Sequence, residues 1–147
     1  MATTQHDKAV RFRALHQGEA FVIPNPWDAG SARMLAALGF QALATSSGAQ
    51  AGVLGRRDGK VSRDEALAHC RAIAEAVDLP VSADLEKGFG DSPAAVAETI
   101  RLAAEAGLVG GSIEDATGNR ERPIYDIGHA AERVAAAAMR SVAWAMS

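Results

Sequence analysis

The sequence predicts an α/β fold in which short parallel strands alternate with amphipathic helices. Short apolar runs that end in polar or glycine residues are each followed by an alanine-rich amphipathic stretch, and this pattern occurs four times. Alanine accounts for 33 of the 147 residues, which suits helices packed closely on a sheet. Apolar runs without strict alternation are typical of parallel strands buried on both faces. The pattern fits an open doubly wound sheet or part of a (β/α)8 barrel, and periodicity does not separate the two.

The first predicted elements are a helix over residues 4–16 and then a strand over residues 20–23, which ends at a Pro-Asn-Pro sequence. A helix over residues 28–38 follows. Gly39 is expected to end this helix, because glycine readily adopts the left-handed conformation found just past a helix C-terminus.

The second unit has a strand predicted over residues 41–45 and a helix over residues 62–77. Ser62 and Glu65 have the spacing of a capping box, in which two side chains satisfy backbone N–H groups at a helix start. The residues between this strand and this helix are predicted to form a long loop.

The third unit has a strand over residues 79–84 and a helix over residues 92–106. The helix begins with a Ser-Pro pair, and Gly107 is expected to end it. In the fourth unit, a strand over residues 108–113 leads through a charged loop to a helix over residues 126–143.

These elements predict a single domain over residues 1–147. After the N-terminal helix, its β/α units cover residues 20–38, 41–77, 79–106 and 108–143.

Composition excludes several classes of protein. The chain has 15 basic and 18 acidic residues, and the basic residues are scattered, so no nucleic-acid partner is expected. The longest uncharged run, residues 34–55, contains many polar and glycine residues, so no membrane span is expected. No signal-peptide core precedes residue 18, and Cys70 cannot form an internal disulfide because it is the single cysteine. A cytoplasmic location is therefore expected.

Polar side chains at the ends of the predicted strands are the candidates for chemistry. Asp84 and Glu114 end neighbouring strands, so their carboxylates are expected to converge at one edge of the sheet. Oxygen ligands suit Mg²⁺, which keeps several of its waters and needs few protein ligands. Spacing alone does not decide whether Asp84 and Glu114 are metal ligands or are polar residues that precede a helix or lie in a surface loop.

Two short glycine-containing sequences allow more than one interpretation. Ser46-Ser47-Gly48 can bind a carboxylate or phosphate through backbone N–H groups, or can form an ordinary turn. Gly88-Phe89-Gly90 resembles the start of a dinucleotide-binding fingerprint, but Pro93 breaks that pattern. These glycines are better explained by a turn or by close approach of the backbone to a ligand.

Four ordered motifs resemble those of the isocitrate lyase/phosphoenolpyruvate mutase superfamily. They are I-P-N-P-W-D-A-G-S-A-R at residues 23–33, A-T-S-S with L-G-R-R-D-G at 44–47 and 54–59, P-V-S-A-D-L-E-K-G-F-G at 80–90, and G-S-I-E-D at 111–115. Their order matches the superfamily from about residue 10 to residue 134. The chain is therefore identified as a member, similar to methylisocitrate lyases or oxaloacetate decarboxylases.

This resemblance implies a (β/α)8 barrel of which the chain covers roughly the first four units. It also implies dependence on Mg²⁺, with Mn²⁺ as an alternative, and cleavage of a bond beside the carboxylate of a small α-oxo or 2-hydroxy acid. By motif position, Asp84 is the direct metal ligand, and Asp58 and Glu114 hold waters of the metal. The substrate-binding residues implied by the resemblance are Ser46, Ser47, Gly48 and Asp84.

The sequence departs from the superfamily pattern in three places. Ser82 replaces the first aspartate of the Asp-x-Asp sequence often found on the third strand. The loop at residues 116–125 lacks the cysteine and histidine that true isocitrate and methylisocitrate lyases carry there. The superfamily also runs well beyond 147 residues, so the chain is expected to be truncated at its C-terminus relative to that family.

These departures leave several functions open. The first is a Mg²⁺-dependent carbon–carbon lyase that acts through a metal-stabilised enolate, with a general acid and base that the sequence does not identify. The second is a non-catalytic remnant or a half-barrel that depends on a partner. Carbon–phosphorus bond chemistry on phosphonopyruvate is a third. Half of a barrel would expose two strand edges, so a homo-oligomer is expected.

Overall fold

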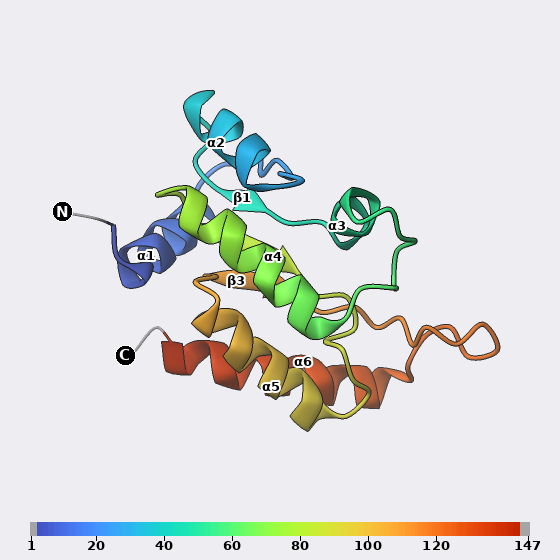
Figure 1. Cartoon of the computed structure of the whole chain (residues 1–147). Helices are drawn as coiled ribbons and strands as arrows, with labels where there is room; N and C mark the ends of the chain where they lie inside the picture. Colours follow the sequence, from blue (N-terminus) through green and yellow to red (C-terminus); the bar gives the residue numbers. More distant parts are fainter. Residues whose placement is uncertain (1–2, 145–147) are drawn as a thin grey trace.

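The computed structural model describes residues 3–144 of the chain, with side chains up to residue 139. Three parallel strands lie side by side in the order of the sequence: β1 (Leu43–Ala44), β2 (Val81–Asp84) and β3 (Gly110–Ser112). Figure 1 shows this small sheet among six helices of the described part of the chain. A doubly wound sheet reverses its strand order at a switch point, whereas this order follows the chain throughout.

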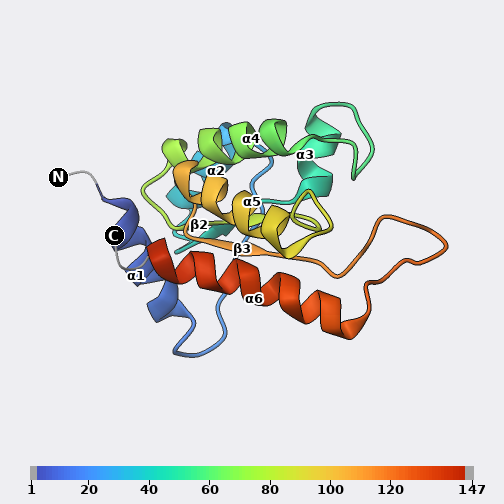
Figure 2. The same ribbon diagram turned by 90° about the horizontal axis from the view of Figure 1, so that it is seen from below.

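The helices follow the same order as the strands. Contacts join α2 (Ala29–Ala37) to α4 (Arg63–Ala76), α4 to α5 (Pro93–Glu105), and α5 to α6 (Ile127–Trp144). In Figure 2, α4, α5 and α6 succeed one another along the sheet. Strands and helices that both advance in chain order are typical of one sector of a (β/α)8 barrel.

The core lies between the sheet and this helix layer. Leu43, Val81 and Leu108 are almost fully buried there, together with Ile73 from α4 and Val96 from α5. Many of the remaining core residues are alanines, so the helix backbones lie close to the sheet.

Local capping explains where several helices begin. In α4, the Ser62 hydroxyl accepts from the backbone N–H of Glu65, and the Glu65 carboxylate accepts from the backbone N–H of Ser62. Asp28 and Ser31 form the same reciprocal pair at the start of α2. Ser92 caps α5, whose first residue is Pro93. These positions agree with those predicted from the sequence.

The first helix, α1 (Gln5–Leu15), covers the end of the sheet at which the strands begin. The Gln5 amide donates to the carbonyl oxygens of Ala104 and Leu108, each at 2.8 Å. Lys8 donates to the carbonyl oxygen of Val77 at 2.7 Å. Because α1 holds the C-terminal ends of α4 and α5, it leaves the opposite edge of the sheet open for chemistry.

Two predictions about elements are wrong. Residues 20–23 are not a strand: one backbone hydrogen bond, from Ala44 N to Pro24 O at 3.1 Å, links this segment to β1. Pro26 has no N–H to donate to the carbonyl oxygen of Ala44, and the side-chain amide of Asn25 donates there instead at 2.8 Å, so the ladder does not continue. The predicted loop after β1 contains a helix, α3 (Ser47–Val53), which Ser46 caps.

No helix among the described residues is long and apolar enough to cross a bilayer.

Candidate functional site

The C-terminal ends of the three strands place polar residues along one edge of the sheet. Ser46 and Ser47 follow β1, Asp84 is the last residue of β2, and Glu114 comes two residues after β3. The pairing of Asp84 with Ser112 puts the ends of β2 and β3 at the same level. The predicted convergence at this edge therefore follows from the register of the sheet.

Asp84 is fixed by hydrogen bonds to both of its carboxylate oxygens. Oδ2 accepts from the backbone nitrogen of Ser47 at 3.0 Å and from the Ser47 hydroxyl at 2.8 Å. Oδ1 accepts from the backbone nitrogen of Glu86 at 3.0 Å. The backbone nitrogen of Asp84 donates to the Thr45 hydroxyl at 3.2 Å. The carboxylate thus has one defined orientation at the sheet edge.

The start of α3 brings the other predicted residues close to Asp84. The Ser46 hydroxyl accepts from the backbone nitrogen of Ala49 at 3.3 Å and caps the helix. A Cβ atom built on Gly48 would lie 3.8 Å from Oδ2 of Asp58. The loop that carries Asp58 therefore returns to the first turn of α3, which also binds Asp84.

Four carboxylates share this region: Asp58, Asp84, Glu86 and Glu114. The pKa of Glu114 is raised, first by partial burial and then by the negative charges of Asp84 and Asp58. The pKa of Glu86 is raised by burial and then by Asp58, Asp84 and Glu114. Burial is the largest single cause of each shift, and repulsion among the ionised carboxylates adds to it.

This donor set fits a hard divalent cation that keeps most of its waters. Carboxylate oxygens are the ligands Mg²⁺ prefers, and a cation among them would relieve the repulsion that raises the two pKa values. Within residues 3–144, no group of three or more His, Cys, Asp or Glu side chains forms a direct metal cage. A cation bound here would therefore have few direct protein ligands.

Sequence reasoning missed Glu86. Its backbone has a left-handed φ of 49°, and its carbonyl oxygen accepts from the backbone nitrogen of Glu114 at 2.8 Å. This turn places the half-buried Glu86 beside the other carboxylates. The sequence does contain a signal that could have identified Glu86: it is a second acidic residue, two positions after Asp84 and just past the end of a strand.

The loop at residues 116–125 lies beyond this edge and extends away from the sheet in both views (Figures 1 and 2). An antiparallel bridge between Ala116 and Ile124 closes it. The Lys87 ammonium group donates to the carbonyl oxygen of Thr117, at the start of this loop, at 2.9 Å.

Comparison with known proteins agrees with this architecture. Residues 12–145 match the family model described as phosphoenolpyruvate phosphomutase. The chain is 36% identical to 2,3-dimethylmalate lyase of Eubacterium barkeri over 110 residues, which are 73% of this chain and 38% of that protein.

Solved structures extend the comparison to the fold. A Burkholderia cenocepacia J2315 protein assigned as a lyase/mutase superposes with a TM-score of 0.91 at 58% identity, over 92% of this chain and 50% of that one. A phosphonopyruvate hydrolase crystallised with oxalate and Mg²⁺ superposes with a TM-score of 0.84 at 25% identity, over 93% of this chain and 48% of that one. The chain thus spans about half the length of the relatives it matches.

The predicted half of a (β/α)8 barrel is confirmed by these superpositions on phosphoenolpyruvate mutase/isocitrate lyase superfamily structures. The matched family model covers most of the sequence and includes all three strands and the carboxylates at their ends. The chain therefore belongs to the phosphoenolpyruvate phosphomutase family, within the superfamily that its motifs resemble.

Proposed function

We propose that this chain is a Mg²⁺-dependent lyase that cleaves a carbon–carbon bond beside the carboxylate of a small α-oxo or 2-hydroxy acid. The observation that carries the proposal is the oriented carboxylate of Asp84 among three further carboxylates at the C-terminal edge of a parallel sheet. The relatives support it, because one is a 2,3-dimethylmalate lyase and another is a hydrolase crystallised with Mg²⁺ and oxalate.

In this proposal the metal residues are Asp84, Asp58 and Glu114. Asp84 binds the cation directly, because Ser47 and the backbone of Glu86 hold its carboxylate in place. Asp58 and Glu114 bind through the water shell of the cation, and Mn²⁺ is expected to substitute for Mg²⁺. When bound, the cation supplies Lewis-acid stabilisation of the negative charge that develops on an enolate oxygen.

The proposed substrate-binding residues are Ser46, Ser47 and Gly48, beside Asp84. Hydroxyl and backbone N–H groups in this segment can donate to a substrate carboxylate. Both donors of Ser47 bind Asp84, so Ser47 fixes the neighbouring metal ligand, and the donors proposed for a substrate carboxylate are the Ser46 hydroxyl and the backbone N–H of Gly48. A carboxylate bound here would therefore lie next to the proposed metal ligand.

Binding of the cation is tested by thermal unfolding with Mg²⁺ and with a chelator. We expect Mg²⁺ to raise the midpoint by several degrees, because a ligand at about 100 times its dissociation constant stabilises a folded protein by about 2.7 kcal/mol. Asp84→Asn should abolish the rise. Asp78→Asn is the matched control, since it makes the same charge change at an exposed site after α4, away from the carboxylates.

Catalysis is tested separately by release of pyruvate or glyoxylate from a panel of oxaloacetate, methylisocitrate-type and phosphonopyruvate substrates. Turnover that requires Mg²⁺ and is lost in Asp84→Asn supports the lyase. Turnover of phosphonopyruvate alone would instead assign carbon–phosphorus bond chemistry.

A second candidate function is a non-catalytic half-barrel, or one that depends on a partner. The observation that favours it is the loop at residues 116–125, which carries neither a cysteine nor a histidine beside the carboxylates. Mg²⁺-dependent stabilisation without turnover of any substrate in the panel would support this second candidate and contradict the first.

A further inference from the structure

Three side chains join the turn after β2 to the loop at residues 116–125. The Lys87 ammonium group donates to Oδ1 of Asp91 at 2.7 Å, and the Tyr125 hydroxyl donates to the same oxygen at 2.5 Å. Lys87 also donates to the carbonyl oxygen of Thr117 at 2.9 Å. We call Lys87, Asp91 and Tyr125 the clamp, because together they contact both ends of the loop.

The two ends of the loop also pair with each other, in a stem formed by residues 115–117 and 123–125. The backbone nitrogen of Thr117 donates to the carbonyl oxygen of Pro123 at 2.9 Å. The backbone nitrogen of Tyr125 donates to the carbonyl oxygen of Asp115, also at 2.9 Å. The clamp contacts one side of this stem at Thr117 and the other side at Tyr125. It therefore fixes the stem as a unit on the turn after β2.

The stem continues directly from Glu114, a carboxylate of the proposed cation site. Among the described residues, no hydrogen-bond donor contacts the Glu114 carboxylate, whereas that of Asp84 accepts three hydrogen bonds. The position of the Glu114 side chain therefore depends on its backbone. That backbone is held on one side by the bond from Glu114 N to the carbonyl oxygen of Glu86 at 2.8 Å, and on the other side by the stem.

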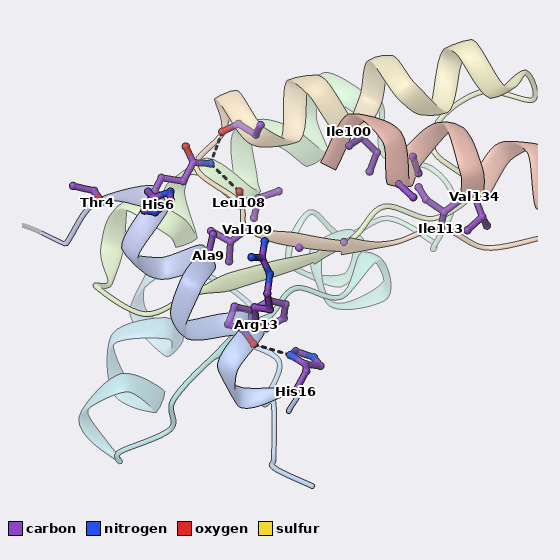
Figure 3. Close-up of a pocket in the computed structure, with 17 residues that line it drawn as sticks. Thr4, His6, Ala9, Arg13, His16, Ile100, Leu108, Val109, Ile113 and Val134 are labelled. Atoms are coloured by element: carbon purple, nitrogen blue, oxygen red, sulfur yellow. Dashed lines mark hydrogen bonds between the residues drawn. The ribbon is translucent and has the colours of Figure 1, made fainter. Parts of the chain in front are cut away.

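Helix α6 supports the clamp and the segment that leads from β3 into the stem. The guanidinium of Arg133 donates to the carbonyl oxygen of Asp91 at 2.7 Å and lies 4.2 Å from the centre of the Tyr125 ring. Val134, the next residue, lies with Ile113 in the lining of a cavity of about 870 Å³ beside β3, as Figure 3 shows. The clamp thus has a firm base on α6.

The clamp residues are more exposed than this base. The side chain of Lys87 is 32% exposed, and that of Asp91 is 73% exposed. Exposed ion pairs contribute little to the stability of a whole protein. Loss of this pair should therefore leave the fold intact and loosen the stem locally.

We propose that the clamp positions Glu114 for the cation, so that Lys87, Asp91 and Tyr125 are positioning residues of the metal site. This inference rests on the proposed function, in which Glu114 holds a water of the cation. With the clamp intact, the backbone is fixed on both sides of this carboxylate. With the clamp broken, the stem moves relative to β2, and the cation must order Glu114 when it binds, which weakens binding.

Two variants break the clamp with little change elsewhere. Lys87→Met removes both contacts of the ammonium group, and Tyr125→Phe removes one hydroxyl but keeps the ring beside Arg133. Lys87→Arg is the conservative variant, because a guanidinium can still pair with Asp91. Arg71→Met is the matched control, since it removes one positive charge from an exposed position of α4.

Hydrogen exchange measures whether the clamp holds the stem. We expect the backbone amides of Glu114, Thr117 and Tyr125 to exchange at least about fivefold faster in Lys87→Met, because the bonds they donate open with the stem. Amides within α4 should keep their rates, which would show that the variant folds. Unchanged exchange at the three amides would mean that the clamp does not hold the stem, and the proposal would be wrong.

Binding of Mn²⁺ alone, followed by the electron paramagnetic resonance signal of the free ion, measures the effect on the metal site. We expect the dissociation constant to rise about tenfold in Lys87→Met, and less in Tyr125→Phe, as for other groups that orient a metal ligand. Lys87→Arg and Arg71→Met should bind like the unaltered protein. Loss of the Lys87 charge would by itself tighten binding of a cation beside these carboxylates, so weaker binding would come from lost positioning.

A double substitution tests whether the clamp acts through Glu114. In a Glu114→Gln background, Lys87→Met should weaken Mn²⁺ binding no further. The same additional weakening in both backgrounds, or unchanged binding in Lys87→Met despite faster exchange, would overturn the proposal. If the unaltered protein binds no Mn²⁺, the proposed cation site is itself wrong, and this role of the clamp fails with it.

Discussion

The carboxylate of Asp84 accepts two hydrogen bonds from one residue, Ser47, through its backbone nitrogen at 3.0 Å and its hydroxyl at 2.8 Å. Ser47→Ala removes the hydroxyl and keeps the backbone donor. We expect the free energy of unfolding to fall by about 1.5–3 kcal/mol, the range for a hydrogen bond to a charged group. Urea denaturation of the two proteins measures this loss.

Ser47→Thr is the control for this change, because threonine keeps a hydroxyl on the same carbon. It should retain most of the stability that Ser47→Ala loses, and it should keep the Mg²⁺-dependent rise in the unfolding midpoint. Equal destabilisation by both substitutions would show that the hydroxyl contact with Asp84 contributes nothing.

Cys70 should be unreactive while the protein is folded. Cys70 lies on α4 in the hydrophobic core, where the residue is 2% exposed, and its thiol is 3.8 Å from the hydroxyl of Thr45. Burial raises the pKa of this thiol to about 11, so little of the reactive thiolate forms near neutral pH. We expect a disulfide reagent to label the native protein roughly 100-fold or more slowly than the same chain in denaturant. Similar labelling rates in both states would contradict the burial of Cys70.

The capping box of α4 should make stability depend on pH. Hydrogen bonds from the backbone and hydroxyl of Ser62, and then from Arg56, lower the pKa of Glu65 from 4.5 to about 2. A depressed pKa in the folded state means that the ionised group stabilises the fold above pH 4.5, and that this contribution is lost as the pH falls toward 2.

Glu65→Gln should therefore be less stable than the unaltered protein at neutral pH, and the difference should shrink as the pH falls below 4.5. Urea denaturation across this pH range measures the difference. Glu75→Gln makes the same charge change at an exposed position of the same helix, outside the capping box, and is the control for the loss of one charge. A Glu65→Gln difference that stays constant with pH would contradict the capping role.

Elements that depend on neighbouring residues in the chain could be predicted from the sequence. The starts of α4 and α5 follow from Ser62, Glu65 and the Ser92-Pro93 pair, which act within one helical turn. Gly39 adopts a φ of 91° just after α2, as expected from its position. Asp84 and Glu114 could be assigned to one edge because parallel strands in succession place their ends together.

Elements that depend on distant contacts could not be predicted. Helix α3 is short and contains Gly48 and Gly52, so local propensity does not favour it. It is held instead by the bonds from Ser47 to Asp84 and from the Gln50 amide to the carbonyl oxygen of Glu65 at 3.1 Å. Residues 20–23 do not form a strand, because the pairing with β1 stops at Pro26, which has no N–H for the carbonyl oxygen of Ala44.

Arg133 should contribute more to stability than any exposed arginine of the chain. Its side chain is 1% exposed and donates to the carbonyl oxygens of Gly90 at 2.8 Å, Asp91 at 2.7 Å and Lys87. Its guanidinium also lies 4.2 Å from the centre of the Tyr125 ring. It thus ties α6 to the turn that follows the proposed metal ligand on β2.

Arg133→Met should lower the free energy of unfolding by about 3 kcal/mol, since it removes the donor to the carbonyl oxygens of Gly90 and Lys87 and leaves that of Asp91 with His129 alone. Arg101→Met is the matched control, because Arg101 forms exposed ion pairs with Glu98 and Glu105, and its loss should cost less than about 1 kcal/mol. Hydrogen exchange should also quicken in Arg133→Met at the backbone amides of residues 86–91, which Arg101→Met should leave protected. Equal losses of stability in the two variants would mean that the buried guanidinium does not hold this turn.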